Sequence, residues 1–255
     1  FDIGAMGYLH RNDLVNLNMG IKFRRQDPWK FIRMGSTVFK YFHMTNTSGL
    51  LLEEKIGIHY RITFMNYWQF GGAINRSSEH YSDRWTYDYE DDKLGPAVKI
   101  PQTDGGYIYI SSDNRHLFSF KLSHGWAKNR LNDIGKHHEL EVGYKPTEYV
   151  DMALNYSLNN SNETYHWLEI TEEYEDDPSS QLLDTHYMFA ESDNRMEVLT
   201  ARISGNLTHN LSLQFYSEYF KRKNEFSDYT ELMEAEEYPQ DNLEYNPYEI
   251  VDPES

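Results

Sequence analysis

Long segments in which apolar and polar residues alternate constrain the fold of this chain more than any other feature. Between Leu14 and Arg25 every second residue from Val15 to Phe23 is apolar, and the residues between them are Asn, Gly, Lys or Arg. A period of two predicts a β-strand with one apolar and one polar face. The segment is longer than the ~5–6 residues of an ordinary soluble strand. It is long enough for the ~9–11 residues with which a tilted strand crosses a bilayer.

The same alternation returns along the chain. It recurs at Leu52–Phe64, Leu117–Trp126, His137–Tyr144, Val150–Asn159, Met196–Gly205 and Leu211–Phe220. We therefore predict an all-β fold: an antiparallel transmembrane (outer-membrane) β-barrel, or a partial barrel, of roughly twelve long strands. The segment Thr164–Ile170 is a candidate for a further strand, so the predicted number of strands can differ by one hairpin.

The links between these segments differ in length. Short, turn-rich links are expected at Gln26–Lys30, Met65–Tyr67, Asp113–His116, Lys145–Tyr149 and Asn206–Asn210. Longer polar links are expected at Thr45–Gly49, Ser77–Leu94 and Ala127–Lys136. Outer-membrane barrels carry short turns on the periplasmic rim and long loops on the other, so we expect the short turns to face the periplasm.

Composition is compatible with this fold. Only 39% of the residues are hydrophobic, and the mean hydropathy is −0.78. These values alone would suggest a soluble protein, but in a barrel only alternate residues meet lipid, so the average stays low. No run of ~18 apolar residues is present, which excludes a membrane-spanning helix.

The net charge of the chain and its distribution limit the binding partners that we expect. The net charge of −17 argues against nucleic acid as a partner. Acidic residues concentrate at Tyr87–Asp92, Glu172–Asp177 and Glu231–Ser255, which are expected to be solvated loops or tails. A divalent-cation site on the Glu172–Asp177 run is the alternative. We predict a barrel segment over residues 1–233, incomplete at both ends, and an acidic loop or tail over 234–255.

No catalytic group is predicted in this segment, and no metal or cofactor. Cysteine is absent, which removes thiolate zinc sites and cysteine nucleophiles. His137 and His138 are adjacent on a strand and so point to opposite faces, which prevents simple chelation of one ion. A glycosidase needs two carboxylates about 5–10 Å apart, and the 41 acidic residues offer too many pairs to rank.

Two groups of residues are candidates for roles in a barrel. The lumen-facing candidates are Lys22, Arg24, Lys55, His59, Arg61, Lys121, Glu139, Glu141 and Asp151. Because such interiors are polar, they would form a structural network or a channel lining. The candidates for an aromatic girdle at the headgroup level are Trp29, Tyr67, Trp68, Trp126, Tyr144, Tyr149 and Phe220.

Several stretches resemble one family. They are Gly7–Asp13, Asn66–Arg76 (Asn-Tyr-Trp-Gln-Phe-Gly-Gly-Ala-Ile-Asn-Arg), Gly95–Pro101, Ser111–Arg115 (Ser-Ser-Asp-Asn-Arg), Leu211–Tyr216 and Tyr229–Leu232. In this order and spacing they resemble the C-terminal outer-membrane barrel domain of unknown function that follows a carbohydrate-binding module family 9-like domain in bacterial envelope proteins. The chain also begins at Phe1, so we expect a fragment from the later part of the barrel.

The resemblance implies a function. The segment would anchor a carbohydrate-binding envelope protein in the bacterial outer membrane and serve as a conduit, with membrane lipid as its partner and a carbohydrate ligand bound through the missing upstream domain. The alternatives are part of a glycoside-hydrolysing envelope enzyme, or a soluble all-β binding protein whose apolar faces pack against a second sheet.

Overall fold

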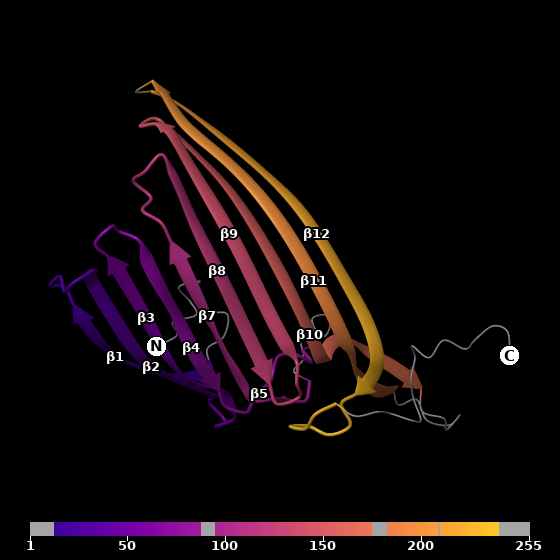
Figure 1. The fold of residues 1–255 in the computed structure, drawn as a ribbon. Coiled ribbons are helices and arrows are strands. Elements are labelled where there is room, and N and C mark those ends of the chain that lie inside the picture. Colours follow the sequence, from indigo (N-terminus) through magenta and orange to yellow (C-terminus); the bar gives the residue numbers. More distant parts are fainter. Residues whose placement is uncertain (1–12, 88–94, 175–182, 209, 240–255) are drawn as a thin grey trace.

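The chain folds into a large, curved and open antiparallel β-sheet. The computed structural model describes residues 13–87, 95–174, 183–208 and 210–239. Over these ranges it contains twelve strands and no helix, and hence no helix long and apolar enough to span a membrane. Ten strands form one sheet in the order β1-β2-β3-β4-β7-β8-β9-β10-β11-β12, and β5 and β6 form a small second sheet. β1 and β12 are the two edges of the large sheet and do not pair with each other (Figure 1).

The last three strands are the longest of the twelve. Their bounds are β1 Leu14–Arg25, β2 Ile32–Asn46, β3 Leu51–Phe64, β4 Gln69–Ser77, β5 His80–Ser82, β6 Val98–Ile100, β7 Thr103–Ser111, β8 Phe118–Asn129, β9 Ile134–Thr147, β10 Val150–Tyr174, β11 Leu183–Thr208 and β12 Leu211–Glu231. The prediction of an antiparallel all-β fold is confirmed. The predicted barrel is not closed by these strands.

The last three strands of the sheet are longer than the sequence pattern indicated. Thr164–Ile170 is not a separate strand, because it continues β10, which is 25 residues long. Two register shifts, between Glu163 and His166 and between Trp167 and Glu169, interrupt its pairing with β11. A bulge inserts an extra residue and so shifts the alternation of side chains between the two faces by one position. The two-residue period of apolar and polar residues is therefore interrupted there, although the strand continues.

All five links predicted to be short lie on the same rim. They join β1 to β2, β3 to β4, β7 to β8, β9 to β10 and β11 to β12; we call this the turn rim, and the opposite one the far rim. The prediction of long loops on the far rim is correct for one link, 78–102, which contains β5 and β6. It is wrong for 47–50 and 130–133, because β2, β8 and β9 extend into the predicted loops.

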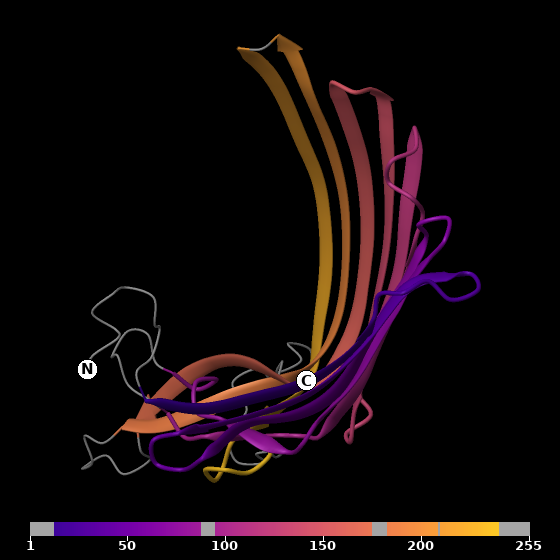
Figure 2. The same ribbon diagram turned by 90° about the vertical axis from the view of Figure 1, so that its left-hand side faces the viewer.

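The register separates the side chains into two faces. We call the face that carries Val15 to Phe23 the apolar face and the one that carries Lys22 and Glu139 the polar face. Along β8 and β9, most side chains of the apolar face are exposed, whereas those of the polar face are half-buried. Bending a sheet crowds the side chains on its concave side, so we assign the polar face to the concave side of the curved sheet seen in Figure 2.

A small hydrophobic core lies at the far rim. Val98, Phe189 and Leu232 are buried together, and three aromatic side chains of β10 and β11 pack around them. The far ends of β10 and β11 bend away from the direction of their other halves (Figure 2). The predicted acidic tail begins in this region: residues 234–239 run beside β6, where the Lys99 N–H donates to the Glu237 carbonyl at 3.0 Å. The rest of that tail lies outside the described residues.

Candidate functional site

All nine predicted lumen-facing residues lie on the polar face. One row of directly paired residues crosses the sheet through Arg24, Ser36, Arg61, Gly71, Tyr109, Ser123, Glu139 and Ser157. The other six, Lys22, Lys55, His59, Lys121, Glu141 and Asp151, follow at even spacing on the same strands or on β10. Residues from β1 to β10 are thus gathered onto one concave surface.

Glu139 is the centre of a hydrogen-bond network on this face. Its carboxylate accepts hydrogen bonds from Lys121 Nζ at 3.1 Å, from Ser123 Oγ at 3.0 Å and from Asn155 Nδ2 at 2.9 Å. The side chain of Glu139 is 24% exposed and that of Lys121 is 39% exposed. Three strands, β8, β9 and β10, therefore contribute to one half-buried polar cluster. Ser123 and Asn155 were missed in the sequence because only the register shows that they face Glu139.

Two hollows lie beside this cluster. One, of about 360 Å³, is lined by Glu139, Glu141, Asn155 and Arg202, among others. The other, of about 330 Å³, is lined by Glu141, Lys121 and residues of the β7–β8 link. Glu141 lines both, so the polar face is continuous from the cluster to the turn rim. Hollows lined by carboxylates, amides and cations suit hydrated polar solutes.

Glycines on this face let aromatic rings lie against the backbone. A Cβ atom at Gly71 would lie 2.6 Å from the ring of Tyr109, and Arg61 Nε donates to the Tyr109 hydroxyl at 3.0 Å. On the opposite face, Tyr60 lies over Gly72 in the same way. The Gly-Gly pair in the Asn66–Arg76 stretch therefore permits a neighbouring side chain to cross each face, which is a use of strand glycine.

The turn rim carries a charged and aromatic cluster. Asp113 is 5% exposed and accepts hydrogen bonds from Arg115 Nε at 2.9 Å, from its terminal nitrogen at 2.6 Å and from its backbone N–H at 3.0 Å. The Arg115 guanidinium lowers the pKa of Asp113 to about 2. The same guanidinium lies 3.4 Å from the centre of the Tyr67 ring, and that of Arg33 lies 4.5 Å from it. These cation–π contacts join two turns of the rim.

The girdle candidates divide into two groups. Trp29, Tyr67, Trp68 and Tyr149 lie in links of the turn rim, and Tyr144 lies near that end of β9. Trp126 lies equally near the far-rim end of β8, which extends to Asn129, whereas the predicted position of Phe220 beside a turn is wrong, because β12 extends to Glu231. Trp126 lies over Gly106 on the apolar face, and Phe220 lies mid-strand on the polar face, opposite Val198.

The histidine and metal predictions can also be placed. His137 Nδ1 is 2.6 Å from Asn159 Oδ1 on the polar face, whereas His138 pairs with His124 on the apolar face, with ring centres 4.5 Å apart. Their opposite orientation is confirmed. No group of three metal-ligating side chains occurs among the described residues. The acidic run at Glu172–Asp177, the alternative cation site, lies outside the side chains that the structure describes.

Comparison with known proteins identifies the family and nothing closer. No curated protein and no solved structure matches the chain. A family model described as "Domain of unknown function (DUF5916)" matches residues 1–250, which is nearly the whole chain. The chain therefore belongs to the DUF5916 family.

Proposed function

We propose that this chain is part of the wall of an outer-membrane β-barrel, which anchors a carbohydrate-binding envelope protein and provides a polar conduit. The proposal rests on the apolar face, where large hydrophobic side chains stand open to the surroundings. On β1 alone, Val15 is 58% exposed, Met19 51% and Phe23 61%. Apolar surface that extends across a whole sheet marks a membrane or protein contact.

The band of apolar residues runs obliquely across the strands, and this observation carries the proposal. On β1 the band extends from Val15 to Phe23, between Asp13 and Arg25. On β12 it extends from Leu211 to Tyr219 and ends before Lys221. The row of paired residues that starts at Phe23 runs through Thr37, Tyr60, Gly72, Ile108, His124, His138, Leu158 and Glu197 and ends at Lys221.

The slope of the band gives a strand tilt. On β1, Phe23 is the residue of the band closest to the turn rim. On β12, the same row of paired residues reaches Lys221, which lies beyond the end of the band closest to the far rim. Between these strands the band shifts toward the turn rim by about ten residues, or ~34 Å. Nine strand spacings of ~4.8 Å separate them, or ~43 Å. A band lying flat in a bilayer would then tilt the strands by ~38°, within the ~35–45° of outer-membrane barrels.

The height of the band agrees with the same assignment. From Val15 to Phe23 the strand rises ~27 Å at ~3.4 Å per residue. A tilt of ~38° reduces this to ~21 Å along the membrane normal, close to the ~25 Å apolar band of such barrels. The far-rim end of the band is marked by charge, because Arg76 and Asp104 form a bidentate ion pair on this face, at 2.6 and 2.9 Å.

The polar face supports the role of a conduit, and the carbohydrate association follows from the family resemblance. No comparable geometry favours the alternatives. The central carboxylate of the polar face, Glu139, already accepts three hydrogen bonds from its neighbours, which does not favour a role in hydrolysis. For a soluble protein, a second sheet would have to cover the apolar face, and within the described residues the only other sheet has two short strands.

Single cysteines test the proposal cleanly, because the chain has none of its own. Leu154→Cys on the apolar face and Asn155→Cys on the polar face form a matched pair of neighbours on β10. After reconstitution of the full chain into phosphatidylcholine vesicles, a charged, membrane-impermeant maleimide is expected to label Cys at 155 and not at 154. A lipid-phase quencher should quench a fluorophore at 154 only. Equal labelling of both positions would refute membrane insertion of this face.

A further inference from the structure

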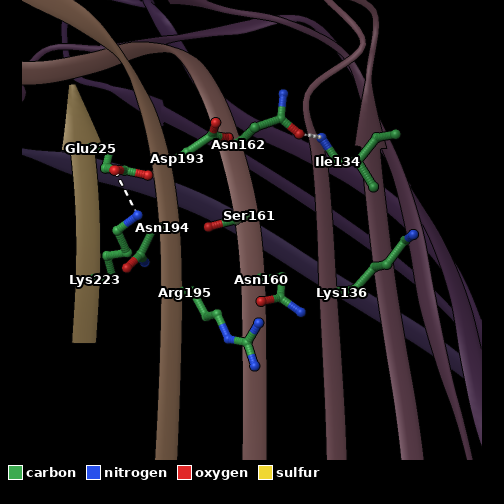
Figure 3. A pocket seen from close by; sticks show the side chains of 10 residues that line it. All are labelled: Ile134, Lys136, Asn160, Ser161, Asn162, Asp193, Asn194, Arg195, Lys223 and Glu225. Carbon is green, nitrogen blue, oxygen red and sulfur yellow. Dashed lines mark hydrogen bonds and ion pairs between the residues drawn. The ribbon is translucent and has the colours of Figure 1, made fainter. Parts of the chain in front are cut away.

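A polar hollow lies on the apolar face, where the band ends toward the far rim. Its volume is about 520 Å³, and its lining comes from four neighbouring strands, β9, β10, β11 and β12 (Figure 3). Four of the lining residues form a single row of directly paired residues: Lys136, Asn160, Arg195 and Lys223. The hollow therefore presents three cations and an amide side by side.

The position of this row follows from the register. On β10, Asn160 is the next residue on the apolar face after Leu158, the last residue of the band. On β9, Lys136 precedes His138 and Leu140 on the same face. Residues directly beyond the apolar band of a membrane β-sheet lie at the level of the lipid headgroups. The row is thus expected to meet headgroups rather than acyl chains.

Strand bulges lie close beyond the hollow. β10 shifts register between Glu163 and His166, and β12 carries an unpaired residue, Asp228, opposite the step from Ala190 to Glu191. Bulges bend strands and increase their twist. The bend of the far ends of β10 and β11 therefore lies close to the hollow (Figure 2).

The charges in the hollow suit a ligand that carries both phosphate and hydroxyl groups. Arg195 forms an ion pair with Glu197 at 2.8 Å, and Lys223 with Glu225 at 2.6 Å. Lys136 makes no ion pair within the described part of the chain. Cations and amide N–H groups bind phosphate oxygens, and carboxylates accept hydrogen bonds from hydroxyl groups.

We propose that this hollow binds a phosphorylated sugar headgroup of an outer-leaflet glycolipid, with Lys136, Arg195 and Lys223 contacting its phosphate. This rests on the proposed function, with the turn rim toward the periplasm and the far rim in the outer leaflet. That leaflet consists of phosphorylated glycolipid in bacteria with two membranes. The carboxylates of Asp193 and Glu225 bind the sugar hydroxyls, which distinguishes this headgroup from that of a simple phospholipid.

The test is lipid binding by the full chain in phosphatidylcholine vesicles that contain lipid A. After mild detergent extraction, native mass spectrometry measures how much lipid A stays bound. In the combined variant Lys136→Gln, Arg195→Gln and Lys223→Gln, the apparent dissociation constant is expected to rise about 100-fold, since each cation near an anionic surface contributes roughly a factor of five. The matched control removes three cations of the polar face, Lys22→Gln, Lys40→Gln and Lys55→Gln, and is expected to bind like the wild type.

The outcomes separate the two proposals. One result would overturn the glycolipid site alone. In it the wild-type chain inserts, as shown by protease protection, but binds lipid A no better than it binds dephosphorylated lipid A. Equal losses in the two triple variants would also overturn it, because the effect would then be general electrostatics. Displacement of lipid A by millimolar inorganic phosphate would assign the site to free phosphate instead. Failure of the wild type to insert would overturn both proposals.

Discussion

Replacing Leu154 by Arg places a charge at the centre of the apolar band. On β10 the band extends from Val150 to Leu158, so Leu154 is its middle residue on this face. The Leu154 side chain is 48% exposed, and its directly paired neighbours on this face, Val142 and Ala201, are apolar. We therefore expect Leu154→Arg to reduce the free energy of unfolding from lipid by about 2–4 kcal/mol, the cost of Arg at the bilayer midplane of such sheets.

Position along and across the sheet determines the size of this effect. Leu158→Arg, at the end of the band, is expected to cost only about 0–1 kcal/mol, because Arg near the interface reaches the headgroups. Met19→Arg, at the centre of the band on β1, is expected to cost about 2–4 kcal/mol. Met19 shares its row of paired residues with Arg76 and Asp104, so this result would follow only from an oblique band.

Urea unfolding in lipid vesicles, followed by tryptophan fluorescence, measures these differences. Ala153→Arg, whose side chain lies on the polar face and lines the hollow beside Glu141, is the control for the introduction of an arginine at the same depth, and we expect it to change stability little. Equal costs at 154 and 153, or a cost at 158 as large as that at 154, would refute the assignment of the apolar face to lipid.

Two further predictions concern the turn rim and the glycines. Because the pKa of Asp113 is lowered from 3.8 to about 2, its ionised form stabilises the fold above pH 4, and this contribution is lost as the pH falls from 4 to 2. Asp113→Asn should abolish that part of the pH dependence of unfolding, and Asp27→Asn should not; an unchanged acid profile in Asp113→Asn would contradict the ion pair. Gly71→Ala should cost about 1–3 kcal/mol by overpacking against Tyr109, whereas at Gly35, where the nearest atom is 3.8 Å away, Ala should fit. Equal stabilities in urea unfolding would contradict that packing.

Alternation in the sequence was sufficient to predict all or part of seven of the twelve described strands, and the faces of their residues. The pattern from Val15 to Phe23 places β1 at its observed bounds, and the nine charged or polar residues predicted to share a surface do so. These features depend only on local periodicity, which one strand carries by itself. The five short links were recognised for the same reason, since each is bounded by two alternating segments.

The sequence did not reveal features that depend on register or on contacts between distant segments. The bulges in β10 interrupt the period of two near Thr164, so a continuous strand looked like two. Val98, Phe189 and Leu232 come from three separate parts of the chain, and no local pattern links them. The basic row at Lys136 and Arg195 likewise exists only because β9 to β12 pair in one register.

The tilt of the strands in a bilayer tests the central claim most directly. Polarised infrared spectroscopy of the full chain in oriented bilayers measures the angle between the strands and the membrane normal from the amide I bands. The oblique apolar band predicts an angle of ~38°. Strands without a preferred orientation, or strands lying parallel to the membrane surface, would contradict the claim that this sheet crosses the membrane.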